Sequence, residues 1–498
     1  MKLVHALRLH PREVVALVGG GGKTTLMFRL ADELVEAGRR VVTTMTTRIF
    51  VGQMARAPVA LTLDDLGDLP AQAAGLLRLL PGALAAHGHV LIAGGRAEEP
   101  DKAQGIPPAL ADLLAAQPCV NCVIVEADGS RRLSFKAPAE HEPVMPSTAT
   151  IVMPVAGMDV VGRPLDAAHV HRPLRVAELT AARLGDPVTA EMIAITLAHP
   201  QGGSRGAPPA ARLMPFLNKV EDEMRLDSAR QVARLLLRQP RVDSVLIGAA
   251  EAADPVAELW SRVAAVVLAA GESRRFGALK QVMPWRGATL VAHVAAQALA
   301  CPDVDRVAVT VGAEAERVIV ALEPDGLHKA FGADRLLVVA APDWAAGQSH
   351  SVLAGLTAVG GLPGLSPQAS PSGDSAPDAK TEPAAVIFLL ADQPGVSPTL
   401  LSALVQRHRE TLAPVVAPRF EGRRGNPVLF DRATFREFAG LHGDIGGRPI
   451  IQAHGDAIAW VDWPTPEILQ DLDRAEDYLY AASGTQAGCS CSGLLLGI

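Results

Sequence analysis

Two short apolar runs, far apart in the chain, each lead directly into a turn built of small residues. Glu13–Val18 precedes the four glycines Gly19–Gly22, and Ala264–Ala270 precedes the turn Gly271–Gly277. The pattern after each turn predicts a helix, which begins at Lys23 in the first case. A buried strand followed by a small-residue turn and a helix is typical of α/β folds. Because the two units lie about 250 residues apart, the sequence predicts two separate folds of this kind.

Other apolar runs of strand length continue this pattern in both halves of the chain. Asp254 to about Ser261 predicts a helix at the end of the first half, and the Gly- and Pro-rich stretch Gln201–Pro209 predicts a surface insertion. The strands expected in the first half are Val41–Met45, Val90–Ala93, Cys122–Glu126, Thr150–Val155, Arg212–Leu217 and Ser244–Ile247. Those expected in the second half are Arg306–Val311, Leu336–Ala340, Ala385–Leu390, Val415–Pro418 and Ala457–Val461.

These elements predict two three-layer α/β domains. The first, over residues 1–255, is expected to be P-loop-like, and the second, over residues 262–481, is expected to be Rossmann-like. Residues 361–383 are rich in Pro, Ser, Gly and Asp, and we expect a disordered insert because this segment cannot bury enough apolar surface to order itself. Residues 482–498 are expected to form a loose tail.

The composition mainly excludes certain classes of protein. Of the 498 residues, 49% are hydrophobic and 4% are aromatic, which fits Ala-rich helices packed on aliphatic strands. The net charge of −7 lacks the basic surplus of a nucleic-acid-binding protein. The apolar runs are far shorter than the ~20 residues of a membrane helix. With few cysteines, of which Cys119 and Cys122 read as ordinary thiols, the chain is expected to be soluble and cytoplasmic, without membrane or nucleic-acid partners.

The turn after the second apolar run carries the strongest chemical signal. It reads Leu268-Ala-Ala-Gly-Glu-Ser-Arg-Arg-Phe-Gly-Ala-Leu-Lys280. Small residues after a strand let backbone N–H groups approach a polyphosphate. Arg275 and Lys280 add positive charge where a triphosphate would lie, since arginine suits bidentate phosphate contact and lysine is a compact point charge. The sequence therefore predicts a nucleotide site at this turn.

A second element places an acid at the end of a neighbouring strand. Val386-Ile-Phe-Leu-Leu-Ala-Asp392 reads as a buried strand followed by a carboxylate. An acid in this position faces the ligand crevice of an open α/β sheet. Because Mg²⁺ binds one or two carboxylates together with substrate phosphates, the pattern is compatible with a metal site at Asp392.

The turn resembles the L-A-A-G-x-S-x-R-x-G-x-x-K signature of the MobA-like nucleotidyltransferase family. The resemblance covers about 263–480, and three further segments narrow it to the molybdenum cofactor cytidylyltransferase branch: Gly347-Gln-Ser-His-Ser, Arg424-Gly-Asn-Pro and His442-Gly-Asp-Ile-Gly-Gly-Arg. Every fixed position of the signature is matched, by Leu268, Ala269, Ala270, Gly271, Ser273, Arg275, Gly277 and Lys280.

The resemblance implies that CMP passes from CTP to a molybdopterin-type cofactor, with Mg²⁺ required and pyrophosphate released. It implies that Asp392 binds the metal, and that Asp473 completes the metal site, because Asp471-Leu-Asp-Arg-Ala-Glu-Asp resembles the family motif D-x-D-T-P-E-D. Arg474 and Ala475 depart from that motif. Asp471 therefore stays an alternative second ligand, and a negatively charged helix start remains the other interpretation of the segment.

Roles for the other residues follow from the same expected reaction. The acceptor phosphate attacks the α-phosphorus, so positioning and charge neutralisation supply most of the catalysis and no general base is needed. We expect Arg275 to bind the leaving phosphates and Lys280 to lie at the α-phosphate, with Asn426 and Arg448 on the acceptor side. GTP, or another phosphorylated acceptor, remains the alternative to CTP and molybdopterin.

The glycines after the first strand predict a second phosphate site. Gly21, Gly22, Lys23 and Thr24 fit a P-loop, in which the lysine contacts phosphates and the threonine contacts Mg²⁺, although Leu17 stands where the pattern has its first glycine. Either of two acids, Glu126 or Asp128, could lie near that metal. Asn218-Lys-Val-Glu-Asp resembles the guanine-reading N-K-x-D, but its Glu221 departs from that motif, and a solvated helix start explains the segment equally well.

This half resembles the YqeC-like family of selenium-dependent hydroxylase accessory proteins over about 5–250. The similarity rests on the Gly19–Thr25 loop, Glu126-Ala-Asp-Gly-Ser, Lys136-Ala-Pro, His141-Glu-Pro and His169-Val-His-Arg. It implies an apo molybdenum hydroxylase as a partner, and it leaves open an NTP-gated carrier or chaperone that delivers the cofactor. His141, His169 and His171 could contact a metal or an anionic cofactor, or could be ordinary hydrogen-bonded histidines.

Overall fold

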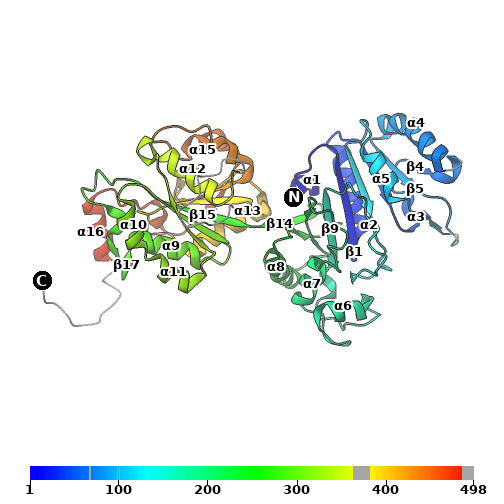
Figure 1. Cartoon of the computed structure of the whole chain (residues 1–498), viewed down its shortest axis with the longest axis horizontal. Helices are drawn as coiled ribbons and strands as arrows, with labels where there is room; N and C mark the ends of the chain where they lie inside the picture. The colour runs from blue at the N-terminus through cyan, green and yellow to red at the C-terminus, as the bar shows by residue number, and fades with distance from the viewer. Residues whose placement is uncertain (67–68, 98, 100, 363–381, 485–498) are drawn as a thin grey trace. The chain divides into compact units, whose positions relative to one another are not determined.

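The computed structural model describes the chain except for residues 67–68, 98, 100, 363–381 and 485–498. It divides into two compact units, Met1–Ser261 and Arg262–Ile498, and each unit has its own sheet (Figure 1). The insert expected at 361–383 and the tail expected at 482–498 fall largely outside the described residues. In the described part of the chain, no helix has both the length and the apolar character needed to cross a membrane.

A ten-stranded sheet forms the centre of the N-terminal unit. Its main path consists of β1 (Glu13–Gly19), β2 (Val41–Met45), β4 (Ala60–Thr62), β5 (His89–Ala93), β7 (Cys122–Glu126), β9 (Ile151–Gly157), β12 (Phe216–Asn218), β13 (Ser244–Gly248) and β14 (Val256–Ser261), and β11 (Arg212–Leu213) pairs with β9. The order is β14-β13-β12-β9-β1-β7-β2-β5-β4. All neighbours along this path are parallel except β13 and β14, so β1 lies between the parallel strands β7 and β9.

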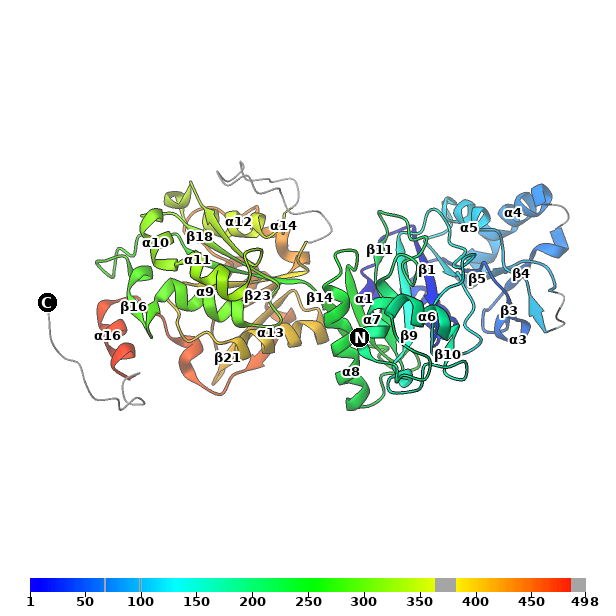
Figure 2. The ribbon, with the colours of Figure 1, turned by 60° about the horizontal axis from the view of Figure 1, so that its bottom comes forward.

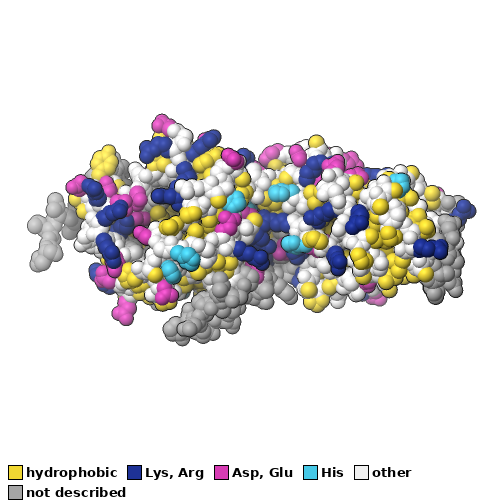
Figure 3. Space-filling model, turned by 90° about the horizontal axis from the view of Figure 1, so that it is seen from above, with side chains coloured by type: hydrophobic (Ala, Val, Ile, Leu, Met, Phe, Trp, Pro, Cys, Tyr) yellow, Lys and Arg dark blue, Asp and Glu magenta, His cyan; other side chains and the backbone are white. Residues whose placement is uncertain are grey.

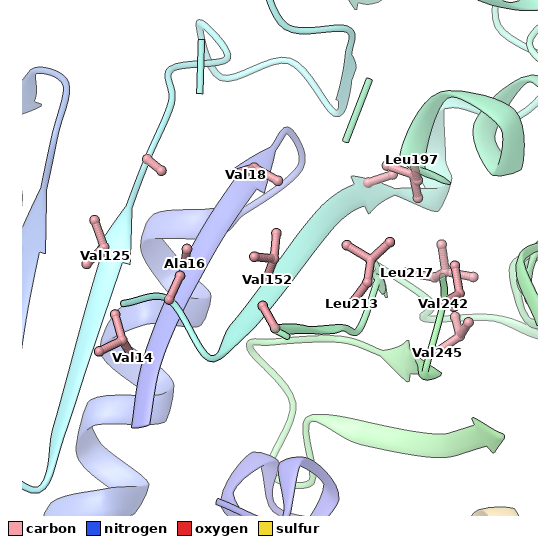
Figure 4. Packing of buried hydrophobic residues seen from close by; sticks show 14 of the residues in the cluster. Val14, Ala16, Val18, Val125, Val152, Leu197, Leu213, Leu217, Val242 and Val245 are labelled. Carbon is pink, nitrogen blue, oxygen red and sulfur yellow. The ribbon is translucent and has the colours of Figure 1, made fainter. Parts of the chain in front are cut away.

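Helices cover both faces of this sheet, because alternate residues of its strands point to opposite sides. Val14, Ala16 and Val18 of β1 join an apolar cluster with residues of α4 (Leu69–His87), α5 (Pro108–Ala115), α7 (Ala190–Ala198) and α8 (Glu223–Leu237); Figure 4 shows part of this cluster. The helix α2 (Lys23–Glu36) packs against β1, β2 and β7 from the other face. The unit is thus a three-layer α/β structure, as the sequence predicts.

The helix predicted from Asp254 to Ser261 is wrong, because β14 is an extended edge strand. It pairs antiparallel with β13, which places Trp260 opposite Val245. Trp260 is 1% exposed, and its ring N–H donates to Glu258, which also pairs with Arg230 of α8 at 2.6 Å. Tertiary pairing therefore overrides the helical propensity of the Ala-Glu-Leu sequence in this segment.

Two other predictions in this unit need correction. The single strand expected over Arg212–Leu217 is divided into β11 and β12, because Pro215 has no N–H to donate to a ladder. The surface insertion expected at Gln201–Pro209 is partly buried: Gly202 and Gly203 pack on the end of α7, where an added Cβ would lie 2.1 Å from the Thr196 carbonyl oxygen and 2.5 Å from that of Leu197. Glycine is thus required by close approach to a helix end.

The C-terminal unit has a mixed eight-stranded sheet. Its strands are β15 (Val263–Ala269), β18 (Arg306–Val311), β19 (Leu336–Ala340), β20 (Ala385–Leu390), β21 (Val415–Phe420), β22 (Arg423–Arg424), β23 (Val428–Asp431) and β24 (Ile458–Asp462). The order is β19-β18-β15-β20-β23-β21-β22, and β24 pairs with β21. The first four strands in this order are parallel, whereas β23 runs antiparallel to both β20 and β21.

Alternate residues of β15 enter two separate apolar cores, which makes this unit three-layered too. Val263, Ala265 and Val267 face a core that includes α9 (Leu290–Ala300), α10 (Ala315–Leu322) and α13 (Pro398–Thr411). Ala264 and Val266 face a second core with α12 (Gln348–Ala358), α14 (Phe435–Phe438) and α15 (Arg448–Ala453). Figure 2 shows α9 and α13 on one side of the sheet and α12 and α14 on the other.

The order of connections places a ligand crevice at the carboxyl ends of β15 and β20. The chain passes from β15 to β18 and β19 on one side of the sheet, and it then returns to form β20 on the other side of β15. In an open α/β sheet, ligands bind outside the carboxyl ends of the strands at such a switch point. Basic, acidic and apolar side chains are interspersed on the face that Figure 3 shows, in keeping with the modest net charge.

We propose that the two units are domains that fold independently, and β14 provides a sharp test of where the first one ends. A fragment 1–255 lacks the strand that carries Trp260, whereas a fragment 1–261 keeps it. Losing this buried side chain should cost about 3–5 kcal/mol and lower the melting temperature by about 10 °C for a fragment of this size. Calorimetry of the two fragments checks this, and equal melting temperatures would show that β14 is dispensable.

Candidate functional site

In the C-terminal unit, hydrogen bonds fix the turn that follows β15. The Ser273 hydroxyl accepts a hydrogen bond from the backbone N–H of Lys280 and donates one to the Gln281 side chain at 3.0 Å. Gln281, which is 4% exposed, in turn donates to the carbonyl oxygen of Gly271 at 2.7 Å. Ser273 and Gly277 both have left-handed backbone, with φ of 55° and 77°. The turn therefore has a defined shape, and no sequence motif indicated the part played by Gln281.

Lys280 links this turn to acids that lie elsewhere in the sequence. It begins the 3₁₀ turn Lys280–Val282, and its ammonium contacts Asp392, two residues beyond the end of β20, and lies 3.4 Å from Asp473. The Lys280 and Asp392 side chains are each 14% exposed. The structure thus brings together the three residues that the sequence predicted at this crevice.

Asp471 completes a cluster of three carboxylates. One oxygen atom from each of Asp392, Asp471 and Asp473 lies within 4.8 Å of the others. Burial, followed by the charges of Asp392 and Asp473, raises the pKa of Asp471 to about 6. Burial alone would lower the pKa of Lys280, but the surrounding carboxylates outweigh it and the pKa is raised.

The charge of this cluster suits a divalent cation. Three carboxylates against the single ammonium of Lys280 leave two negative charges when all of them are ionised. Carboxylate oxygens at this spacing form the hard ligand set that Mg²⁺ or Mn²⁺ takes, with substrate oxygens filling the remaining positions. Asp392, Asp471 and Asp473 are therefore the residues that would hold a metal. The sequence left open whether Asp471 or Asp473 accompanies Asp392, and in the structure both lie beside it.

The remaining residues predicted at the nucleotide site differ in exposure. Arg275 is 85% exposed, and its guanidinium is 4.0 Å from Asp473, so the side chain borders the crevice from the solvent side. Ala269 and Ala270 are buried at the end of β15, and Gly271 is exposed. Leu268 is half-buried and lines a neighbouring pocket.

That pocket, of about 440 Å³, lies beside the acid cluster, because Leu390 at the end of β20 lines it. Asn426 and Arg448, both predicted on the acceptor side, line the same pocket. Phe388 and Phe430 contribute an aromatic wall, and their rings lie 5.8 Å apart. A pocket with apolar walls and a few convergent polar groups is the usual form of a small-molecule site.

Arg424 is a further pocket residue, for which the sequence motifs indicated no role of its own. It is half-buried, and burial followed by the charge of Arg448 lowers its pKa. Among the described residues, no carboxylate lies within ion-pair distance of either arginine. Two guanidinium groups that repel each other in a partly apolar pocket favour an anionic ligand, and phosphate is the group that arginine binds in bidentate fashion.

The glycine turn of the N-terminal unit lies at the carboxyl end of β1, against a buried ionic network. The Lys23 ammonium is 3.3 Å from Asp128 and 3.7 Å from Glu126, and it donates to the Gly19 carbonyl oxygen. Its pKa is raised, because the attraction of Asp128 and Glu126 outweighs the opposing effect of burial. The Thr24 hydroxyl donates to Glu126 at 2.8 Å. Both acids considered from the sequence therefore lie at the predicted lysine and threonine.

A second row of charges lies behind the first. Lys136, whose side chain is fully buried, contacts Asp128 at 3.0 Å and Glu142 at 2.7 Å. Arg172 also pairs with Glu142, at 2.6 Å. Despite its burial, the hydrogen bonds from Arg172 and Lys136 lower the pKa of Glu142 to about 2. Three cations thus balance three carboxylates, namely Lys23, Lys136 and Arg172 against Glu126, Asp128 and Glu142.

The turn differs from a P-loop in a way that explains Leu17. Strand β1 continues to Gly19, and Leu17 is paired within the ladder, opposite Glu126. The turn itself is therefore only Gly20–Gly22, shorter than the pattern requires. Asn218 holds it from one side, because its amide donates to the Gly21 carbonyl oxygen at 2.7 Å. Glu221 is exposed and pairs with Arg225 just before α8 begins at Glu223, which fits a solvated helix start.

His141, His169 and His171 are not gathered into one metal-binding cluster among the described residues. His169 forms a 2.8 Å hydrogen bond with Asp166, which is the ordinary arrangement that the sequence left open. Burial, then the charges of Arg172 and Lys136, lower the pKa of His171 to about 4, so this side chain is neutral at physiological pH. His141 is exposed.

Comparison with known families assigns the two units separately. Residues 15–174 match the family described as YqeC protein, and residues 265–458 match the MobA-like NTP transferase domain. The chain is 31% identical over 237 residues to the YqeC protein of Escherichia coli (strain K12), which covers 47% of this chain and 86% of that relative. It is 28% identical over 224 residues to nicotine blue oxidoreductase of Paenarthrobacter nicotinovorans, which covers 43% of this chain and 93% of that relative.

Among solved structures, the chain is similar to a homologue of Mycobacterium tuberculosis Rv0371c from Mycobacterium sp. strain JC1. The sequence identity is 28%, the match covers 45% of this chain and 98% of that chain, and the TM-score is 0.36. A nucleotidyl transferase from Methanothermobacter thermautotroptrophicus is also similar, with 21% identity, 46% and 99% coverage and a TM-score of 0.34.

The acid cluster predicts an unusual response to loss of its lysine. Lys280→Met removes the cation that competes for Asp392 and Asp473. The affinity for Mg²⁺ or Mn²⁺ should then rise about tenfold or more, since a unit charge at this distance is worth several kcal/mol of interaction. Titration calorimetry with each ion measures this. Arg274→Met is the matched control, because it removes one positive charge at an exposed side chain paired only with Glu272. Equal affinity in the two variants would argue against a metal site here.

Proposed function

Because this chain belongs to the YqeC family and carries a MobA-like NTP transferase domain, we propose that its C-terminal unit transfers CMP from CTP to a molybdopterin-type cofactor. Nucleotidyl transfer is the reaction class of that domain. The proposal adds the identity of the nucleotide, the identity of the acceptor, the release of pyrophosphate and a requirement for Mg²⁺. It is supported by the matching motifs at Leu268–Lys280 and Arg424–Pro427.

One observation carries the proposal: a lysine and three carboxylates converge at the switch point of the sheet, beside a pocket with two arginines that form no ion pair with any described carboxylate. The acids suit a metal-bound triphosphate, and the arginines suit a phosphorylated acceptor. A reaction between two phosphates requires both groups within one crevice, because positioning supplies much of the rate.

Each residue then has a role in charge control. The exposed Arg275 is free to turn onto the departing β- and γ-phosphates, and Lys280 neutralises charge at the α-phosphate. Asp392, Asp471 and Asp473 would hold Mg²⁺, which supplies further neutralisation of the phosphates when bound. An ionised acceptor phosphate attacks the α-phosphorus and pyrophosphate leaves, so the chain needs no general base.

The acceptor would occupy the pocket beside this cluster. Arg424 and Arg448 are placed to bind its phosphate, and Asn426 can hydrogen-bond to its polar edge. Phe388 and Phe430 offer apolar surface to a ring system. The volume of about 440 Å³ lies within the range of pockets that bind small organic ligands.

A second candidate function for this unit is an oxidoreductase, which one observation favours. The chain is 28% identical to nicotine blue oxidoreductase over nearly all of that relative. The two candidates differ in one measurable product. Nucleotidyl transfer releases pyrophosphate from the nucleoside triphosphate, whereas oxidation or reduction releases none.

The test is therefore a turnover assay with purified molybdopterin, Mg²⁺ and either CTP or GTP. We expect pyrophosphate to appear with CTP, together with a product that carries both pterin and CMP. Faster turnover with GTP would change the proposed nucleotide but retain the reaction class. An absence of pyrophosphate with every nucleotide and acceptor tried would favour the oxidoreductase candidate.

For the N-terminal unit, we propose nucleotide binding at Gly21, Gly22, Lys23 and Thr24. Support comes from a lysine at the N-terminus of α2, where backbone N–H groups and the helix dipole favour an anion, and from the contact of Thr24 with Glu126. Such a site could gate delivery of the finished cofactor to an apo molybdenum hydroxylase. Copurification with that enzyme in the presence of nucleotide would support the carrier role.

Asp392→Asn should remove transferase activity and leave the fold intact. The substitution keeps the size of the side chain but withdraws one charge from the acid cluster and from Lys280. A lost metal ligand costs several kcal/mol of transition-state stabilisation, so the rate should fall about a thousandfold or more. Pyrophosphate release at saturating Mg²⁺ measures this, with circular dichroism as the control for folding. Near-normal turnover would overturn the assignment.

Arg424→Gln and Arg448→Gln should weaken acceptor binding selectively. Each substitution removes one of the two arginines that line the pocket. Both arginines are far in sequence from the nucleotide-binding turn at Gly271. Because a charged hydrogen bond to phosphate contributes about 1.5–3 kcal/mol, the KM for the acceptor should rise roughly tenfold to a hundredfold. The KM for CTP should change little. If both KM values rise together, the pocket does not separate acceptor from nucleotide.

Lys23→Ala should abolish nucleotide binding by the N-terminal unit and leave cytidylyl transfer nearly unchanged. Its ammonium is the cation at the glycine turn, whereas the transferase site has Arg275 and Lys280. Calorimetry of the full chain with ATP and GTP in Mg²⁺, before and after the substitution, measures the binding that depends on Lys23. If the wild-type chain shows no such binding at millimolar nucleotide, the P-loop proposal fails.

A further inference from the structure

The backbone donors of the glycine turn are already hydrogen-bonded to the protein. The Gly19 N–H lies 3.0 Å from both carboxylate oxygens of Asp128, and the Gly20 N–H donates to the Val155 carbonyl oxygen at 2.9 Å. The Gly21 N–H donates to the Leu133 carbonyl oxygen at 3.0 Å. A glycine turn binds polyphosphate through such N–H groups, so the conformation in this structure has part of that capacity occupied.

The acceptor for Gly21 comes from a segment that crosses the turn. Residues 129–134, here named the strap, follow Asp128 and lead into the short strand β8 (Phe135–Lys136). The Leu133 carbonyl oxygen would lie 2.6 Å from a Cβ added at Gly20, and the Ser134 carbonyl oxygen 2.8 Å from one added at Gly21. The strap therefore lies directly on the turn, where only glycine leaves room for it.

The strap is held at its second end by side chains. The Ser134 carbonyl oxygen accepts from the Gly157 N–H at 2.8 Å, and the Ser134 hydroxyl donates to Asp159 at 3.0 Å. Lys219 donates to the Ser134 hydroxyl at 2.7 Å and pairs with Asp159 at 2.9 Å. These contacts anchor one end of the strap, whereas its middle is exposed at Arg131 and Arg132.

The exposed middle has an unfavourable backbone. Arg131 and Arg132 have φ of 51° and 65°, so two consecutive residues with side chains lie in the left-handed region. That conformation costs about 1–2 kcal/mol for each residue other than glycine. A packing contact partly offsets this cost, because the Arg132 guanidinium lies 4.7 Å from the centre of the Phe50 ring. The covered conformation is thus strained at the place where it is exposed to solvent.

We propose that the strap is an autoinhibitory segment, which covers the glycine turn in the conformation of this structure and must open before nucleotide phosphates bind. The proposal rests on nucleotide binding by the N-terminal unit and specifies how that binding is controlled. Phosphate oxygens would replace the Leu133 carbonyl oxygen at the Gly21 N–H. They would also replace Asp128 and Glu126 as partners of the Lys23 ammonium.

The second row of charges makes that exchange feasible. A buried carboxylate left without a cation is strongly destabilising. When Lys23 turns towards phosphate, Asp128 keeps Lys136 at 3.0 Å and the Gly19 N–H, and Glu142 keeps Arg172. Of the three acids, Glu126 is the one that loses its cation when Lys23 is released, and it keeps the hydrogen bond that the Thr24 hydroxyl donates.

Two double variants of the full chain isolate the strap from its charges. Arg131→Ala with Arg132→Ala and Arg131→Gly with Arg132→Gly both remove two positive charges, but glycine alone relieves the left-handed strain. Relief of this strain should stabilise the covered state. This gain should exceed the stabilisation of the open state by the extra conformational entropy of glycine. Because apparent affinity falls with the open fraction, Lys23-dependent binding of ATP or GTP should be about tenfold weaker in the glycine variant than in the alanine variant.

Calorimetry measures that ratio, with Lys23→Ala in each background to subtract binding elsewhere in the chain. Hydrogen exchange of the wild-type chain gives a second readout, since saturating nucleotide should speed exchange across residues 129–134. Equal affinities of the alanine and glycine variants, or unchanged exchange on binding, would overturn the strap while retaining the nucleotide site. An absence of Lys23-dependent binding in the wild-type chain would overturn both. Cytidylyl transfer should be the same in all of these strap variants.

Discussion

In both units, a lysine that follows the central strand pairs with an acid that follows the neighbouring parallel strand. Lys23 meets Asp128, two residues beyond β7, and Lys280 meets Asp392, two residues beyond β20. Parallel strands present their carboxyl ends at one edge, so an acid and a lysine placed in this way must come together. Neither charge could be buried alone without a large cost in free energy. The two candidate sites are built around these two ion pairs.

The two ion pairs differ in the charges that surround them and in their exposure to solvent. In the N-terminal unit, further cations balance the acids, and the network is closed to solvent around Lys136. In the C-terminal unit, carboxylates outnumber the lysine, and Asp473 is 49% exposed. The first arrangement stores compensated charge in the interior, whereas the second presents excess negative charge to a cation arriving from solvent.

Much of this organisation could be predicted from sequence, because short motifs report on local backbone. Runs of Val and Ile and the turns that follow them predicted most strands of the two large sheets but not β4, β14, β22 or β23, and both lysines lie where the motifs place them. The β14 strand was missed because its conformation depends on pairing with β13 rather than on local propensity. Arg424 and Asp471 acquire their significance from neighbours distant in the chain. The contact of Leu133 with Gly21 involves only backbone atoms, which no residue pattern records.

The position of Leu17 has a consequence for how such chains diverge. In a P-loop the first glycine leaves the sheet, but here Leu17 is inside β1 and opposite Glu126, so the ladder itself selects for an apolar residue. Core packing at this fully buried position would disfavour a substitution of Leu17 by glycine. A pattern that requires the first glycine would therefore pass over homologues built like this unit. The glycines of the tightened turn, together with the acid two residues beyond the adjacent strand, form the combination that should persist through descent.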